Sequence, residues 1–230
     1  EDLFKQPPPR EECDICCLPV PFINSEAAYQ TCCGKTLCAG CLHADRIKNK
    51  REPICPFCRT PWPTSYGEAL ERLKKRAEGD DADAIFELAS RYRDGEMGLT
   101  RNCNKAMKLW LRAGELGCDM AHHRVGFAYF EGRGVERDTE KAEYYYELAA
   151  MRGNVIARYN LGVMEGNAGN AKRAVKHLMI AAGAGSNDSL TAIRHAFLRG
   201  DATKDDFEKA LRAHKEAADE MKSEQREAAA

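Results

Sequence analysis

The chain has 230 residues, of which 43% are hydrophobic and 31% charged, and its 35 Lys and Arg side chains almost balance 36 Asp and Glu. The net charge of −1 argues against nucleic-acid binding, which usually needs a basic face. No apolar run reaches the roughly 20 residues of a membrane helix, so we expect neither a nucleic-acid nor a membrane partner. Without a signal peptide the expected location is intracellular and cytoplasmic, although the sequence begins at Glu1 and a missing leader would overturn this.

Residues 1–12 are charged and include Pro7, Pro8 and Pro9, a run that favours the polyproline II conformation. We interpret this segment as a disordered tether ahead of the first folded domain. A plain linker is favoured here over a ligand for a proline-binding domain.

Nine of the eleven cysteines lie between residues 13 and 58. Three pairs have the C-x2-C spacing, which turns two thiolates toward one metal ion, and the fourth pair is a doublet. Eight sulfurs are enough for two closed tetrahedral Zn²⁺ sites, and only Cys17 is left over. Because thiolates fill every position, we expect two structural zinc ions rather than a catalytic metal or a disulfide framework. The predicted ligands are Cys13, Cys16, Cys32, Cys33, Cys38, Cys41, Cys55 and Cys58.

The order of these pairs resembles the RING finger family. In that family the first and third pairs share one ion and the second and fourth pairs share the other, an arrangement called a cross-brace. The resemblance implies a module over residues 13–61. Its first zinc ion would be held by Cys13, Cys16, Cys38 and Cys41.

The second pair departs from the RING pattern, which commonly has Cys-x-His just before the third pair. Here the matching residues are Cys33, Gly34 and Lys35, and a lysine ammonium has no lone pair for a metal. Either Cys32 and Cys33 act together or His43 supplies the missing ligand. We favour Cys32, at the cost of a strained turn, because adjacent side chains normally diverge.

The RING resemblance also implies a docking surface for a ubiquitin-conjugating enzyme. In the family this surface has an aliphatic residue in the first knuckle, a proline in the last and a cation after the final cysteine. Ile15, Pro56 and Arg59 stand at these positions. The implied function is a ubiquitin-protein ligase that positions a thioester for lysine attack, with Arg59 bridging both partners and no catalytic nucleophile of its own. The alternative is a non-catalytic zinc-containing scaffold or adaptor.

After a stiff exit at Pro61-Trp62-Pro63, residues 66–78 carry an apolar stripe at helical spacing. A Lys/Arg-Ala pair then recurs every 32 to 36 residues, followed at fixed offsets by an alanine and by Gly117, Gly153 or Gly185. This period predicts an α-solenoid of helix pairs that bury their apolar faces against neighbouring pairs. We expect the glycines to end helices, and large side chains such as Trp110 and Tyr145 to fill the space between layers.

These repeats resemble Sel-1-like repeats, which are related to the tetratricopeptide repeat. The second unit has the fullest match, including Ala121, Gly126 and the turn Gly132-Arg133-Gly134-Val135. The fourth unit, ending near Ser223, is degenerate and is expected to cap the stack. A RING-like finger combined with such repeats resembles proteins of diatoms, brown algae and other stramenopiles.

The expected fold is therefore mainly α: a small two-zinc cross-brace module, an α-solenoid of helix-turn-helix repeats over residues 65–223, and a disordered tail over residues 224–230. The resemblances imply that the solenoid recruits a protein substrate or adaptor. Lone histidines on its helices are expected to be surface or interlayer residues rather than ligands. They are His122, His123, His177 and His195.

Overall fold

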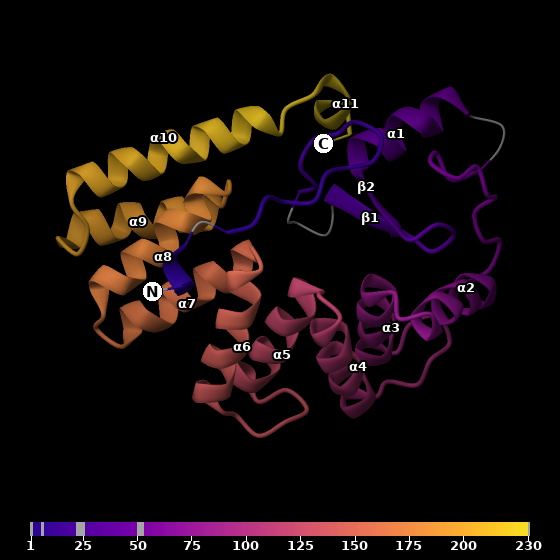
Figure 1. The fold of residues 1–230 in the computed structure, drawn as a ribbon, viewed down its shortest axis with the longest axis horizontal. Helices are drawn as coiled ribbons and strands as arrows, with labels where there is room; N and C mark the ends of the chain where they lie inside the picture. The colour runs from indigo at the N-terminus through magenta and orange to yellow at the C-terminus, as the bar shows by residue number, and fades with distance from the viewer. Residues whose placement is uncertain (1, 6, 22–25, 50–52, 230) are drawn as a thin grey trace.

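The computed structural model describes residues 2–5, 7–21, 26–49 and 53–229. Helices dominate it and form a curved stack, with the cysteine-rich region lying inside the curve (Figure 1). The mainly helical solenoid predicted from the repeats is confirmed. The elements are η1 (Asp2–Phe4), β1 (Ala27–Gln30), β2 (Lys35–Cys38), α1 (Ala39–Lys48), α2 (Tyr66–Glu78), α3 (Ala82–Asp94), α4 (Cys103–Glu115), α5 (Asp119–Glu131), α6 (Thr139–Met151), α7 (Val155–Asn167), α8 (Ala171–Gly183), α9 (Asn187–Arg199), α10 (Lys204–Glu220) and α11 (Glu224–Glu227).

Local sequence sets the ends of the solenoid helices. Most of them begin at a short polar side chain that accepts the amide hydrogen three residues further on, which satisfies an otherwise unpaired donor. Gly117, Gly153 and Gly185 follow the second helix of successive pairs with φ of 113°, 95° and 94°. Glycine adopts such angles without a Cβ clash, so these residues end the helices as predicted. The caps are Ser65, Asp81, Asn102, Asp138, Asn154, Ser186 and Thr203.

Paired helices approach closely where a glycine of the first faces a large side chain of the second. A Cβ on Gly126 of α5 would lie 2.8 Å from the Tyr146 ring of α6, and one on Gly162 of α7 would lie 2.8 Å from Leu178 of α8. Tyr146 is 1% exposed and fills the space between layers. Tyr145, to which the prediction gave this role, is partly buried; it packs against the core of α3 to α5 and stacks on Tyr129, with 5.8 Å between ring centroids.

Gly126 provides a test of this close packing. We expect Gly126→Ala to destabilise the fold by about 1–3 kcal/mol, because the new methyl group must displace Tyr146. Gly166→Ala is the matched control in α7, since its Cβ would meet only Ala174 Cβ at 3.8 Å. That substitution should be neutral or stabilising by up to about 1 kcal/mol through helix propensity. Urea unfolding measures both changes, and equal effects would contradict the packing argument.

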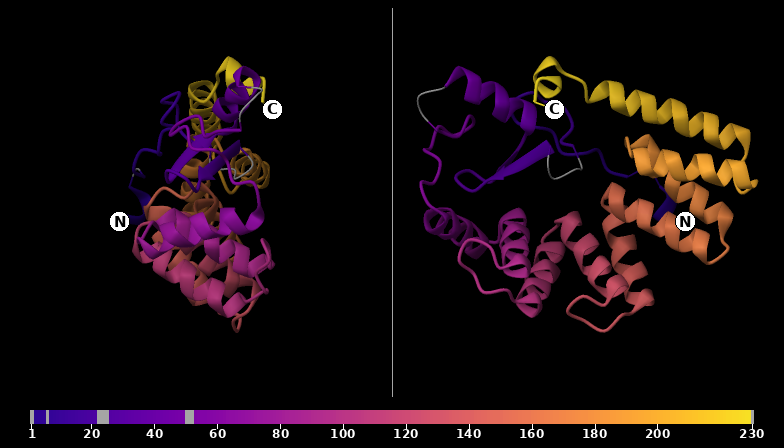
Figure 2. Two further views of the ribbon diagram at one scale, coloured as in Figure 1. Left: turned by 90° about the vertical axis from the view of Figure 1, so that its right-hand side faces the viewer. Right: turned by 180° about the vertical axis from the view of Figure 1, so that it is seen from behind.

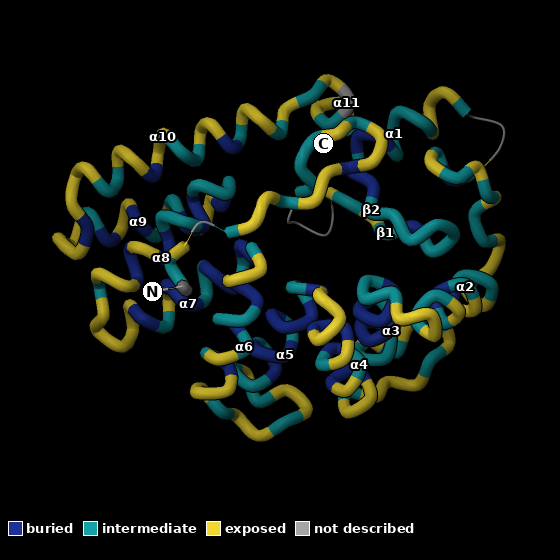
Figure 3. The backbone as a smooth tube through the Cα atoms, in the orientation of Figure 1, coloured by how far each residue is buried: buried dark blue, intermediate teal, exposed yellow. Residues whose placement is uncertain are grey.

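Buried residues follow the facing sides of the helices along the stack (Figure 3). His122, His123 and His177 are among them, whereas His195 is exposed, so the predicted surface or interlayer placement is confirmed. The part of the chain that the structure describes contains no helix long and apolar enough to cross a membrane.

The cysteine-rich region is attached to the start of the solenoid by polar contacts. Tyr29 Oη of β1 donates to Asp81 Oδ2 over 2.7 Å, and Arg76 Nε donates to both groups over 2.9 Å. Trp62 lies under the Arg46 guanidinium of α1, 5.1 Å from its ring centroid, so this tryptophan packs on the cysteine-rich region.

The two ends of the described chain lie against other parts of the fold. η1 lies against α6, far along the solenoid from the cysteine-rich region that follows it in sequence (Figure 1). At the other end α10 runs back over the curve and α11 lies against α1, as the reverse view in Figure 2 also shows. A Cβ on Gly40 of α1 would lie 2.8 Å from Arg226 N of α11, so glycine allows this close contact.

Candidate metal centre

Eight cysteine sulfurs gather into two groups in the cysteine-rich region. Within each group every sulfur lies within 4.8 Å of the others. The first and third pairs along the sequence share one group, and the second and fourth pairs share the other. The first group is Cys13, Cys16, Cys38 and Cys41, and the second is Cys32, Cys33, Cys55 and Cys58.

The first and last knuckles have the same backbone geometry. In each, the amide of the first cysteine donates to a carbonyl five residues on: Cys13 N to Leu18 O over 2.9 Å, and Cys55 N to Thr60 O over 2.8 Å. In each, the residue after the second cysteine has a positive φ, and its amide donates a hydrogen bond to the carbonyl of the first cysteine. These residues are Cys17, with φ of 55°, and Arg59, with φ of 62°.

A β-turn brings the adjacent cysteines of the second group together. β1 and β2 pair antiparallel, and the amides of Cys33 and Gly34 both donate to Gln30 O. The residue with a positive φ in this turn is Gly34, at 74°. Because glycine adopts this angle without a Cβ clash, the turn avoids the backbone strain expected for adjacent cysteine ligands. His43, the alternative ligand, belongs to neither group among the described residues.

The sulfur separations fit a tetrahedral ion. Four Zn–S bonds of about 2.3 Å imply sulfurs about 3.8 Å apart. Cys16 and Cys38 are separated by 3.8 Å, and Cys33 and Cys55 by 3.9 Å. Backbone amides add support, since Cys38 N lies 3.5 Å from Cys13 Sγ in hydrogen-bonding geometry. Each group could therefore hold a metal ion that accepts thiolate ligands.

The electrostatics of the groups favour deprotonation of some thiols and oppose it for others. Burial raises the pKa of Cys13, but backbone N–H groups outweigh this and lower it to about 7. The pKa of Cys58 is likewise raised by burial but lowered to about 6 by hydrogen bonds from Thr60. Burial and the neighbouring Cys55 thiolate raise the pKa of Cys33 to about 11. Four crowded thiolates therefore need either protons or a cation.

The cysteines also make up most of the interior of this region. Its buried cluster consists of three cysteines and Leu37, with Cys16, Val20 and Leu42 partly buried around them. A module this small cannot be held by one buried leucine, and small domains of this kind usually need a disulfide or a metal. The eight grouped cysteines are free thiols and could hold metal ions that stabilise this region.

The predicted partner-binding residues lie at the tips and edge of the two knuckles. Ile15 in the first knuckle is 41% exposed, and Pro56 in the last is partly buried. Sequence reasoning missed Phe57, which is 44% exposed beside Pro56, although its position inside C-P-F-C matched that of Ile15 inside C-D-I-C. Arg59 lies 3.8 Å from Asp45 of α1 and keeps 59% of its side chain exposed.

Lys35 connects the first and last knuckles. Its Nζ lies 3.0 Å from Asp14 Oδ1 of the first knuckle and 5.7 Å from the ring centroid of Phe57 in the last. The ammonium therefore bridges the loops that carry the exposed apolar side chains.

The arrangement of helix pairs defines the larger part of the chain as an α-solenoid. Its repeats are Sel1 repeats: the Sel1 repeat family model matches residues 82–118, 119–154 and 155–186, which correspond to the pairs α3–α4, α5–α6 and α7–α8. The pair α9–α10 extends the stack beyond these matches.

Relatives and solved structures agree with this assignment. HRD3B of Arabidopsis thaliana, an ERAD-associated E3 ubiquitin-protein ligase component, is 43% identical over 61 residues, 26% of this chain and 10% of that protein. Chitin synthase regulatory factor 3 of Schizosaccharomyces pombe is 29% identical over 101 residues, 42% of this chain and 11% of that protein. The chain thus spans about a tenth of these relatives. A Sel1 repeat protein from Oxalobacter formigenes matches with a TM-score of 0.59 and 25% identity, over 66% of this chain and 64% of that one.

Proposed function

We propose that residues 13–61 form a RING-type module with two structural zinc ions that binds a ubiquitin-conjugating enzyme, and that the solenoid over residues 65–223 recruits a protein substrate or adaptor. The exposure of Ile15 and Phe57 at the tips of two matched knuckles carries the proposal. Large apolar side chains displayed on rigid turns are typical of the centre of a protein interface.

In this proposal the zinc ions, when bound, hold the knuckles in place, and the chain's own side chains make the contacts. Ile15 and Phe57 bury apolar area against the conjugating enzyme, and Lys35 keeps the two tips at a fixed separation through Asp14 and Phe57. Arg59 exchanges its exposed, weak pairing with Asp45 for acceptors on the charged enzyme. The thioester is then oriented for attack by a substrate lysine.

Discharge of ubiquitin from a panel of charged conjugating enzymes tests this function. We expect the zinc-loaded chain to accelerate transfer to free lysine with at least one enzyme. Ile15→Ala should reduce that rate tenfold or more, because the lost apolar contact is worth roughly 1–3 kcal/mol in a weak interface. Arg59→Ala should leave docking nearly intact and slow transfer itself.

Ile47→Ala is the matched control, since Ile47 of α1 is 54% exposed in the same module and has the same side chain as Ile15. It should retain the wild-type rate. All three variants should keep two zinc ions, because none of these residues is a predicted ligand. If a folded, zinc-loaded chain discharges no enzyme in a broad panel, the ligase function is wrong.

A non-catalytic scaffold or adaptor is the second candidate, and two observations favour it. The left-handed backbone of Arg59 and its pairing with Asp45 give this residue a place in the fold that needs no partner. In addition, the Arabidopsis relatives are named as components of a ligase. In a scaffold, Ile15 and Phe57 would bind a partner without accelerating ubiquitin transfer.

A further inference from the structure

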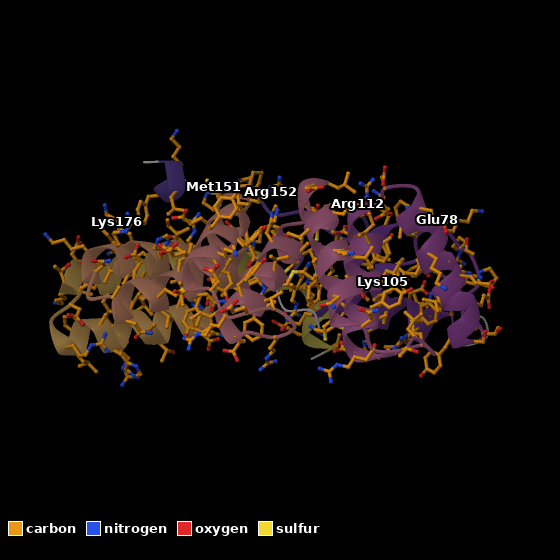
Figure 4. All side chains as sticks on the ribbon, turned by 90° about the horizontal axis from the view of Figure 1, so that it is seen from below. Glu78, Lys105, Arg112, Met151, Arg152 and Lys176 are labelled. Carbon is orange, nitrogen blue, oxygen red and sulfur yellow. The ribbon has the colours of Figure 1, made fainter. Side chains whose placement is uncertain are left out.

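A short segment ahead of the cysteines contacts α6, α7 and α8, and the surface of the solenoid that it covers is called the groove below. The Phe4 ring of η1 packs against His177 of α8, with 4.7 Å between ring centroids. The cations of Arg173 and Lys176 lie over the same ring at 5.5 and 5.3 Å. Figure 4 shows Lys176 on the edge of the solenoid nearest to η1. Leu3 packs against the buried cluster of α6 and α7.

The floor of this groove contains a buried arginine. Arg158 of α7 is 2% exposed, and no carboxylate pairs with it in the described part of the chain. Its Nη1 donates to Leu3 O, and its Nη2 donates to Ala150 O over 2.7 Å. A buried guanidinium that is satisfied by backbone carbonyls, one of them from a separate segment, is suited to binding a peptide main chain.

His177, the ring in the groove that contacts Phe4, is buried without hydrogen bonds to the described part of the chain. His177 is fully buried, yet neither ring nitrogen has a hydrogen-bond partner among the described residues. Burial and the nearby Arg158 keep its pKa at about 4, so the ring is neutral and presents an apolar face. The ring is thus available to stack on an aromatic side chain, and Phe4 occupies this position.

The segment leaves the groove as an extended proline run. A Cβ on Gly153 would lie 3.6 Å from Pro8 O and 3.8 Å from Pro7 Cβ, so these prolines lie beside the glycine that ends α6. A three-residue helix has no stability of its own, and only its contacts with the solenoid hold it there.

We propose that the groove formed by Arg158, Arg173, Lys176 and His177 is an exchangeable binding site for a short peptide. The peptide has adjacent aliphatic and aromatic residues in one helical turn, an acidic residue before them and prolines after them. Residues 1–9 of the chain have this sequence, and their described part is the resident occupant. The cations of the groove attract the acidic residue that precedes the aliphatic and aromatic pair. A segment of a partner protein with the same features binds by displacing the resident segment. The site lies on α6–α8 and does not depend on the zinc module.

Binding of a dye-labelled, end-capped peptide with the sequence of residues 1–9 to the full chain tests the proposal. Leu3→Ala with Phe4→Ala in the chain empties the groove, and fluorescence anisotropy should then detect binding. The affinity of the wild-type chain for the peptide should be lower by about tenfold or more, because its own segment competes for the groove. In the emptied chain, Lys176→Gln should weaken binding about two- to fivefold through loss of the cation–π contact, and Lys172→Gln on the same helix should not.

A second measurement uses the wild-type chain, so that the proposal can be tested even if the variant with Leu3→Ala and Phe4→Ala folds poorly. In the wild-type chain, excess peptide carrying Gln in place of Lys should speed tryptic cleavage after Lys5 by displacing the resident segment. A peptide that also has Ala in place of Phe should have no effect. The proposal is wrong if the emptied chain keeps its melting temperature but does not distinguish the Phe and Ala peptides. It is equally wrong if cleavage after Lys5 does not respond, because residues 2–9 are then a fixed strap.

Discussion

Chelation of the metal should unfold residues 13–61 while the solenoid keeps its helices. Structural zinc of this kind contributes on the order of 10–16 kcal/mol. Among the described residues of the module, the buried cluster consists of Leu37 and cysteines. Helices α2 to α10 have their own core, which includes Trp110, Tyr146 and Leu161. We therefore expect most of the far-UV circular dichroism signal to survive, and hydrogen exchange to become fast over the cysteine-rich region.

Elemental analysis of the untreated chain should find two zinc ions per molecule, which is the starting point for this experiment. Addition of Zn²⁺ after chelation should restore protection in residues 13–61, whereas Mg²⁺, which prefers oxygen ligands, should not. One ion per chain, or a region that stays protected after complete metal removal, would contradict the two-site arrangement.

Cys32→Ser should release one of the two zinc ions. Cys32 Sγ lies 3.4 Å from Cys58 Sγ within the second group, and serine at this position offers only a poor ligand for zinc. The first group shares no sulfur with the second, so it should keep its ion. Metal content and the loss of protection around β1 and β2 measure the result.

His43→Ala is the matched control for this substitution, because His43 is the alternative ligand and belongs to neither group. The variant should keep both ions. If His43→Ala releases zinc and Cys32→Ser does not, the assignment of the second site is wrong. Cys17→Ser is a further control, since Cys17 is an exposed thiol outside both groups and should be silent.

The parts of this fold that local periodicity governs were predictable from sequence. The recurring alanine and glycine positions gave the helix pairs, and Gly117, Gly153 and Gly185 ended helices where expected. The C-x2-C spacing predicted metal ligands, whereas the grouping of the cysteines was anticipated only from the resemblance of their order to RING fingers. That Tyr146 is buried more deeply than the predicted Tyr145 could not be anticipated, since a one-residue rotation about a helix depends on the partner helix.

The long-range contacts of the two ends were not predictable from sequence. Residues 2–4 and 224–227 are too short to show helical periodicity, so the local pattern does not predict that they are ordered. Their order comes from partners more than a hundred positions away, such as Arg158 for Leu3 and Cys16 for Arg226. Likewise, the bridging role of Lys35 depends on two loops that meet only after the module folds.

The docking of both ends has a consequence for how the repeat array unfolds. A linear array of repeats behaves as a chain of nearest-neighbour couplings, and its terminal units fray first because each has only one neighbour. Here Arg226 Nη2 of α11, beyond the last helix pair, donates to Leu18 O over 3.4 Å, and Tyr29 of the same cysteine-rich region contacts Asp81 at the start of the stack, so the two ends of the array are coupled. The couplings thus form a ring, in which neither end of the array is free. Since the closing contact between Arg226 and Leu18 spans 208 sequence positions, the ring should close late in folding and open early in unfolding.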